Sequence, residues 1–122
     1  MFNKLFAVCL LVSDFEKSLT FYRDVLGLEI NSQDGKFANF KLEGTELAIF
    51  QRDEATAMVS KDQMGSGGGA VYGFQVDDVN KSCESLKTKG VEIFEGPKKT
   101  EWGQTVAYFK DPDDNIWEIS EK

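Results

Sequence analysis

The chain has 122 residues, of which 41% are hydrophobic, and its formal net charge is −7. This length suits one compact domain that buries a sizeable core without needing disulfides or metal. The negative charge disfavours nucleic acid and anionic membranes as partners, because both select a basic face. Two cysteines, no evident signal peptide and no apolar run approaching ~20 residues predict a cytoplasmic protein with free thiols.

The first half of the chain predicts a β-α-β-β-β order of elements. An apolar strand is expected from Leu5 to Val12. A helix should follow from a cap at Ser13 or Asp14 to about Leu26, with a stop at the next glycine. Three short strands are then expected at 29–32, 37–42 and 47–52, separated by turns at Asp34-Gly35 and Glu43-Gly44.

The second half predicts the same order of elements after a joining segment at 53–69. This segment ends in a glycine-rich run, which we interpret as a flexible linker because no Lys-Ser/Thr pair and no helix follow it. The expected elements are a strand at 70–76, a helix at 79–89, and strands at 91–95, 105–110 and 116–120.

The two halves also repeat each other in their residues. Val12-Ser13-Asp14-Phe15-Glu16-Lys17-Ser18 recurs as Val76-Asp77-Asp78-Val79-Asn80-Lys81-Ser82, and Gly27-Leu28-Glu29-Ile30 recurs as Gly90-Val91-Glu92-Ile93. The spacing makes the second helix one residue shorter than the first. Such a repeat indicates two copies of one supersecondary unit that bury a face together. We expect a single domain with units at 1–52 and 70–122 and a linker at 53–69.

Three motifs resemble those of one known superfamily. They are the run from Val12 to Asp14 with Lys17-Ser18 and Phe21-Tyr22-Arg23-Asp24-Val25-Leu26-Gly27-Leu28, then Trp102-Gly103-Gln104, then Asp111-Pro112-Asp113-Asp114-Asn115-Ile116-Trp117-Glu118. Together they resemble the vicinal oxygen chelate superfamily, which includes glyoxalase I, the bleomycin resistance proteins and the extradiol dioxygenases. The resemblance implies an α+β fold, in which two tandem βαβββ units form an open, barrel-like mixed sheet around a concave ligand cavity. It also implies a homodimer.

The resemblance implies four metal-ligand positions, and this chain fills them with residues that do not bind metal well. The matching positions are Ala7, Val71, Glu118 and, as the repeat partner of Glu118, Ile49 or after a one-residue slip Phe50. A catalytic divalent metal needs about three protein ligands, and the chain contains no histidine. We therefore predict no metal and no cofactor.

Period-two alternation then predicts which strand residues face the cavity. The predicted ligand-contacting residues are Ala7, Cys9, Ile49, Gln51, Val71, Gln75, Trp102 and Glu118. This set is mainly apolar with a few polar groups, as in small-molecule pockets. The alternative is that these side chains fill a small solid core.

Glu118, Trp102 and Cys9 have more than one possible role. Among apolar neighbours, desolvation favours the neutral form of Glu118, so it could accept a substrate proton, bind a ligand amine or hydroxyl, or do neither. Trp102 lies in a loop and could stack on a planar ligand or pack over the sheet edge. Cys9 lacks a basic neighbour, which favours an inert apolar residue over a nucleophile.

Three functions remain open on these residues. We favour a metal-independent protein that binds an apolar or aromatic small molecule, similar to the drug-sequestering resistance proteins. The alternative is a glyoxalase-like lyase or isomerase that uses Glu118 as general base, so whether the chain is an enzyme stays open. The third is a regulatory module with a vestigial cavity.

Overall fold

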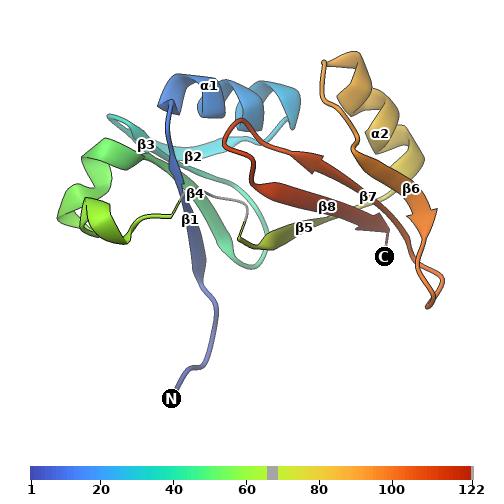
Figure 1. Ribbon diagram of the computed structural model, residues 1–122, viewed down its shortest axis with the longest axis horizontal. Coiled ribbons are helices and arrows are strands. Elements are labelled where there is room, and N and C mark those ends of the chain that lie inside the picture. Colours follow the sequence, from blue (N-terminus) through green and yellow to red (C-terminus); the bar gives the residue numbers. More distant parts are fainter. Residues whose placement is uncertain (66–68, 122) are drawn as a thin grey trace. The chain divides into compact units, whose positions relative to one another are not determined.

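The structure is a computed structural model, and it describes residues 1–65 and 69–121. The chain forms two compact units, Met1–Gly65 and Ser66–Lys122. Each unit contains one four-stranded mixed sheet and follows the β-α-β-β-β order (Figure 1), which confirms the predicted fold class. That the two units together make one domain stays a prediction, and residues 66–68 of the predicted linker lie outside the described residues.

The first unit has the strand order β1-β4-β3-β2. Its elements are β1 (Ala7–Val12), α1 (Phe15–Thr20), the π-helical turn η1 (Phe21–Val25), β2 (Ile30–Asp34), β3 (Phe37–Phe40) and β4 (Glu46–Gln51). Strand β1 pairs with β4 in parallel, and the other two ladders are antiparallel. The predicted strands and turns of this half are confirmed to within two residues at most ends.

The first helix begins and ends where the sequence predicts. The Asp14 side chain accepts a hydrogen bond from the Lys17 amide at 3.1 Å, so it caps an otherwise unpaired N–H. Gly27 follows the helix with a φ of +75°, a conformation in which glycine avoids the steric penalty of a side chain. Between them, the Leu26 amide donates to the Phe21 carbonyl, which is the wide spacing of a π turn. This turn absorbs the extra residue that the repeat spacing indicates.

The segment after β4 is more ordered than the sequence analysis expected. Two short 3₁₀ helices, η2 (Arg52–Ala57) and η3 (Lys61–Gln63), occupy part of the predicted linker. The Ala55 side chain within η2 is fully buried. This small apolar side chain anchors η2 to the first unit. The part of the predicted linker that η2 and η3 occupy is therefore ordered, and a flexible linker stays a prediction only for the rest of 53–69.

The second unit has the strand order β5-β8-β7-β6. Its elements are β5 (Val71–Val76), α2 (Val79–Thr88), β6 (Glu95–Lys99), β7 (Thr105–Lys110) and β8 (Ile116–Glu121). Asp78 caps α2 just as Asp14 caps α1, through a bond from the Lys81 amide at 3.0 Å. Strand β5 pairs with β8 in parallel, which repeats the arrangement of the first unit.

The predicted strand at 91–95 is wrong at its start, because Val91 closes the preceding helix and the strand itself begins only at Glu95. The Val91 amide donates to the Leu86 carbonyl at 2.9 Å, directly after Gly90 with its φ of +86°. Strand β6 therefore starts at Glu95 and extends to Lys99. It has a register shift where Gly96 passes so close to β7 that an added Cβ would lie 2.7 Å from the Val106 carbonyl oxygen.

Each sheet buries the face that its helix covers. In the first unit the Tyr22 and Phe40 rings meet on that face, with centroids 5.8 Å apart. In the second unit Trp117 stacks on Phe74 at 4.4 Å and is 3% exposed. These aromatic contacts supply much of the apolar burial that holds each helix to its sheet.

The last strand of each unit also binds the start of its own helix. The Gln51 side-chain oxygen accepts from the Phe15 amide at 2.7 Å, and the Glu121 carboxylate accepts from the Val79 amide at 2.9 Å. Since Phe15 and Val79 are equivalent in the repeat, these bonds make Gln51 and Glu121 equivalent too.

Candidate functional site

The strand registers show which residues share the face of each sheet opposite its helix, here called the helix-free face. In the first unit Leu10 aligns with Ile49 and Val12 with Gln51, while Cys9 aligns with Ala48. Leu10, Val12 and Ile49 are buried on the helix side, so Cys9 and Ala48 belong to the helix-free face.

The predicted orientation of two candidate residues is therefore wrong. Ile49 is fully buried on the helix-facing side of β4. The Gln51 amide is bound to the helix, accepting from Phe15 and donating to the Ser13 carbonyl at 2.8 Å. The error came from the repeat alignment. The segment that joins β3 to β4 is one residue shorter than the equivalent segment that joins β7 to β8.

The ladders correct the repeat partner of Glu118. Tyr108 aligns with Glu118 in the second unit, and Asn39 aligns with Ala48 in the first. The repeat partner of Glu118 is therefore Ala48, not Ile49 or Phe50. The corrected set of four positions still contains a single carboxylate, and no group of three or more His, Cys, Asp or Glu side chains occurs within residues 1–65 and 69–121.

Glu118 forms a close pair with a residue that the sequence analysis did not single out. The Tyr108 hydroxyl donates to Oε2 of Glu118 at 2.6 Å, and both side chains are partly exposed. This bond to Glu118, together with burial and the charges of Glu118 and Glu95, raises the pKa of Tyr108 to about 12. The phenol therefore stays protonated at neutral pH and holds its single proton against the carboxylate.

Aromatic and cationic side chains surround this pair. The Phe94 ring lies 6.1 Å from the Tyr108 ring and is 43% exposed. The Lys98 ammonium lies 5.6 Å from the centre of the Tyr108 ring, and it also forms an ion pair with Glu95. The Lys110 ammonium lies 5.5 Å from the centre of the Phe94 ring. Such contacts are typical of cation–π interactions.

The other predicted residues of the second unit lie at more exposed places. Val71 and Gln75 occupy the helix-free side of β5, and Val71 is 59% exposed. Trp102 lies in the turn between β6 and β7, where it is 76% exposed and its indole N–H donates to Gln104 at 3.1 Å. Whether Trp102 stacks on a ligand or packs over the sheet edge stays a prediction.

On the first unit, the helix-free face carries a polar network centred on Asn39. The Asn39 side chain is 8% exposed, accepts from Ser32 Oγ at 2.6 Å and donates to Glu46 at 2.7 Å. Cys9, two residues along from Ala7, is half-buried, and burial followed by the charge of Glu46 raises its thiol pKa. A raised pKa leaves less thiolate, as expected for an unreactive cysteine.

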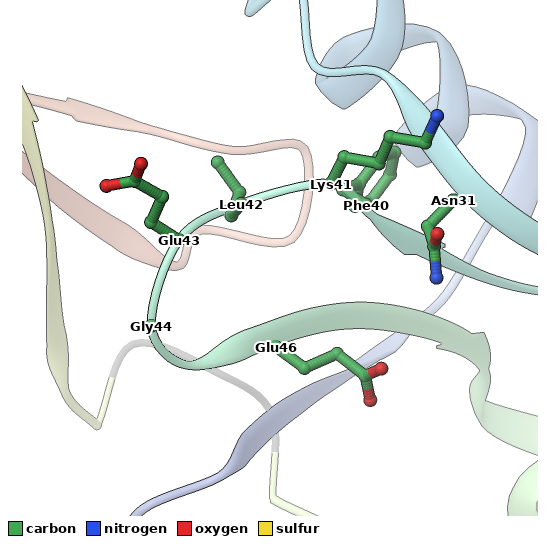
Figure 2. Close-up of a pocket in the computed structure, with 7 residues that line it drawn as sticks. All are labelled: Asn31, Phe40, Lys41, Leu42, Glu43, Gly44 and Glu46. Atoms are coloured by element: carbon green, nitrogen blue, oxygen red, sulfur yellow. The ribbon is translucent and has the colours of Figure 1, made fainter.

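A shallow hollow of about 500 Å³ lies beside this network at the turn between β3 and β4. Its lining residues are Asn31, Phe40, Lys41, Leu42, Glu43, Gly44 and Glu46. Figure 2 shows the Asn31 and Glu46 side chains on the same side of the hollow, away from Glu43. None of the predicted ligand-contacting residues lines it.

Sequence reasoning missed Tyr108, Lys110 and Phe94, and one signal could have found the first two. Period-two alternation along β7 puts Tyr108 and Lys110 on one face, and the antiparallel partner of Tyr108 is Glu118. The face that Tyr108 occupies follows only once the register of β7 against β8 is known.

Comparison with known proteins adds a family to this geometry. Residues 5–122 match the model of the glyoxalase-like domain. The chain is 36% identical over 123 residues to the uncharacterized protein YraH of Bacillus subtilis, covering 95% of this chain and 96% of that one. It is 28% identical to a probable lactoylglutathione lyase of Synechocystis, covering 84% and 82% of the two chains.

A solved structure agrees in fold. The glyoxalase/bleomycin resistance protein/dioxygenase from Nocardioides superposes with a TM-score of 0.83 at 24% identity, covering 99% of this chain and 84% of that chain. Among the described residues, no helix has the length and apolar character needed to cross a membrane.

Proposed function

The chain belongs to the glyoxalase-like domain family, as the resemblance to the vicinal oxygen chelate superfamily predicts, and from this premise we propose that it binds a small molecule without a metal. The ligand is apolar or aromatic and carries a hydrogen-bond donor for Glu118. Sequestration of this ligand, as in bleomycin-resistance-type proteins, is the proposed role.

The observation that carries this proposal is the bond from Tyr108 to Glu118. The phenol has one proton, and it is donated to Oε2. Within the described part of the chain, the Glu118 side chain makes no other hydrogen bond. When the carboxylate is ionised, its Oε1 is a hydrogen-bond acceptor and cannot donate. A complementary ligand must therefore donate an N–H or O–H group, and an ammonium fits best next to a negative charge.

The ring surfaces beside the pair support an apolar body on the ligand. The Phe94 side chain is exposed on one side of Tyr108, and Val71 is exposed on the same face of the sheet. Burial of such surface contributes about 25 cal/mol per Å² before association costs are subtracted.

The test compares phenethylamine with ethylbenzene, which has the same ring and no donor. We expect phenethylamine to shift the amide NMR signals of Tyr108 and Glu118, and Glu118→Gln to weaken this binding about fivefold or more. Glu84→Gln, an exposed change on α2, is the matched control and should bind like the wild type. Equal binding of both probes to the wild type and to Glu118→Gln would overturn the proposal.

Native mass spectrometry of the purified protein tests the metal-independent part. We expect masses of the protein and its small ligand alone. A stoichiometric zinc, nickel, iron or manganese ion removed by Glu118→Gln would contradict it. The same spectrum reports oligomeric state, which we propose to be a homodimer; the cytoplasm is the proposed location.

A lyase is the second candidate function, and the Synechocystis relative is the observation that favours it. In that case Glu118 accepts a substrate proton through Oε1 while the Tyr108 hydroxyl holds Oε2. Turnover of lactoylglutathione that is lost in Glu118→Gln would support the lyase over the binding protein.

A further inference from the structure

We propose that the ligand of the second unit is a zwitterion, with an ammonium bound by Glu118, a carboxylate bound by Lys110 and an apolar group against the Phe94 ring. This inference rests on the proposed function and specifies the class of its ligand. It follows from the placement of one unpaired cation next to the Tyr108–Glu118 pair.

Lys110 differs from the other lysine at this face. The Lys98 ammonium is neutralised by its ion pair with Glu95. Lys110 is exposed, and within residues 69–121 its ammonium contacts the Phe94 ring but no carboxylate. In a chain with a net charge of −7, a cation that has not been paired with a nearby acid is available to an anionic group of a ligand.

The pairing of β7 with β8 places Lys110 and Glu118 near each other. Lys110 aligns with Ile116 and Tyr108 aligns with Glu118, so Lys110 and Glu118 are diagonal neighbours on the same face of an antiparallel pair. Residues in this relation lie about 7–8 Å apart, with a somewhat shorter distance between their Cβ atoms. They do not pair with each other, and the gap between them suits a group the size of an amino acid's ammonium and carboxylate.

The rings place the apolar part of such a ligand. Phe94 contacts both Tyr108, at 6.1 Å, and the Lys110 ammonium, at 5.5 Å. It is 43% exposed, so its free surface lies next to the Tyr108 ring and the Lys110 ammonium. A ligand that fits the three groups is an amino acid, or another amine–carboxylate, with an aromatic or aliphatic side chain.

Three probes with one ring separate the contributions of the charges. They are free phenylalanine, which is a zwitterion, phenethylamine, which lacks the carboxylate, and phenylpropanoate, which lacks the ammonium. We expect free phenylalanine to bind most tightly, about three- to fivefold tighter than phenethylamine, as an exposed ion pair allows. NMR titration should move the amide signals of Phe94, Lys110 and Glu118.

Two substitutions assign the effect to its residues. Lys110→Met should remove the advantage of free phenylalanine over phenethylamine. Lys87→Met, an exposed change on α2, is the matched control and should keep that advantage. Phe94→Ala should weaken all three probes alike, because it removes the apolar contact they share.

The outcomes distinguish this inference from the proposed function. If phenethylamine binds through Glu118 but free phenylalanine binds no better, the zwitterion is overturned and the binding function stands. If free phenylalanine keeps its advantage in Lys110→Met, the assignment to Lys110 is overturned. If no probe binds the wild type, both proposals fail.

Discussion

At equivalent positions in their sheets, the first unit pairs Asn39 with Ala48, whereas the second unit pairs Tyr108 with Glu118. Asn39 turns instead to Glu46 and to Ser32, and its side chain is 8% exposed, with its oxygen accepting from Ser32 and its amide nitrogen donating to Glu46. Tyr108 and Glu118 bond to each other and stay partly exposed.

This difference teaches that one scaffold supports two kinds of polar surface. The caps at Asp14 and Asp78 and the strand-end bonds of Gln51 and Glu121 are the same in both units. The helix-free face of the first unit uses its polar groups to satisfy one another, which stabilises the sheet. The second unit leaves acceptor capacity free, as a binding site requires.

The largest expected effect tests whether the scaffolds are equivalent in stability. Phe40 and Phe109 hold matching core positions and are 3% and 1% exposed. We expect Phe40→Ala and Phe109→Ala each to lower the free energy of unfolding by about 3–5 kcal/mol, because each leaves a cavity. Denaturant unfolding measures this. Phe2→Ala, at a fully exposed position, should change little, and a loss below about 1 kcal/mol in one core variant alone would break the equivalence.

The next effect concerns Gly96, which has no counterpart in the first unit's β2. An added Cβ there meets the Val106 carbonyl and must also accept a φ of +89°. We expect Gly96→Ala to lower the free energy of unfolding by about 3 kcal/mol or more. Gly90→Ala has a similar φ of +86° but open space around its Cβ, so it should lose only about 1–2 kcal/mol. Equal losses in the two variants would show that backbone conformation alone sets the effect.

The Tyr108–Glu118 pair of the second unit predicts a loss of stability in alkali. The pKa of Tyr108 is raised from its usual 10 to about 12, so the folded state favours the protonated phenol. The stability this provides is fully present below pH 10 and is lost as the pH rises through about 12.

The measurement is the free energy of unfolding against pH for the wild type and Tyr108→Phe. The difference between them should shrink between pH 10 and 12. Tyr72→Phe, which leaves the pair intact, should keep the alkaline loss. A difference that is constant with pH would contradict the role given to this hydrogen bond.

The smallest effect concerns the turn before the last strand of each unit. The first unit has Gly44 at this position with a φ of +85°, and the second has Asp114 with a φ of +63°. Glycine adopts this conformation without the steric penalty of a side chain, so Asp114→Gly should raise the free energy of unfolding by a few tenths to about 1 kcal/mol. Thermal unfolding measures the gain, and Gly44→Asp should give the opposite sign.

Much of the fold could be predicted because its determinants are local. The caps at Asp14 and Asp78 and the stops at Gly27 and Gly90 each act within a few residues. The start of β6 at Glu95 could not be predicted, because the composition of 91–95 favours a strand whereas Val91 closes the helix.

The site was harder to predict because it depends on register between strands. Glu118 was found from its motif, but its partner Tyr108 could be identified only from the pairing of β7 with β8. Ile49 and Gln51 were assigned to the wrong face because a shift of one residue reverses the direction of every side chain in a strand.

The bonds from Gln51 and Glu121 to their helices have a consequence for how the two halves could be exchanged. Each of these hydrogen bonds joins the last strand of one half to the first residue of the helix in the same half. A chimaera that joins two copies of either half would keep this hydrogen bond in both copies. Modular recombination of this chain therefore needs no new bonds within a half.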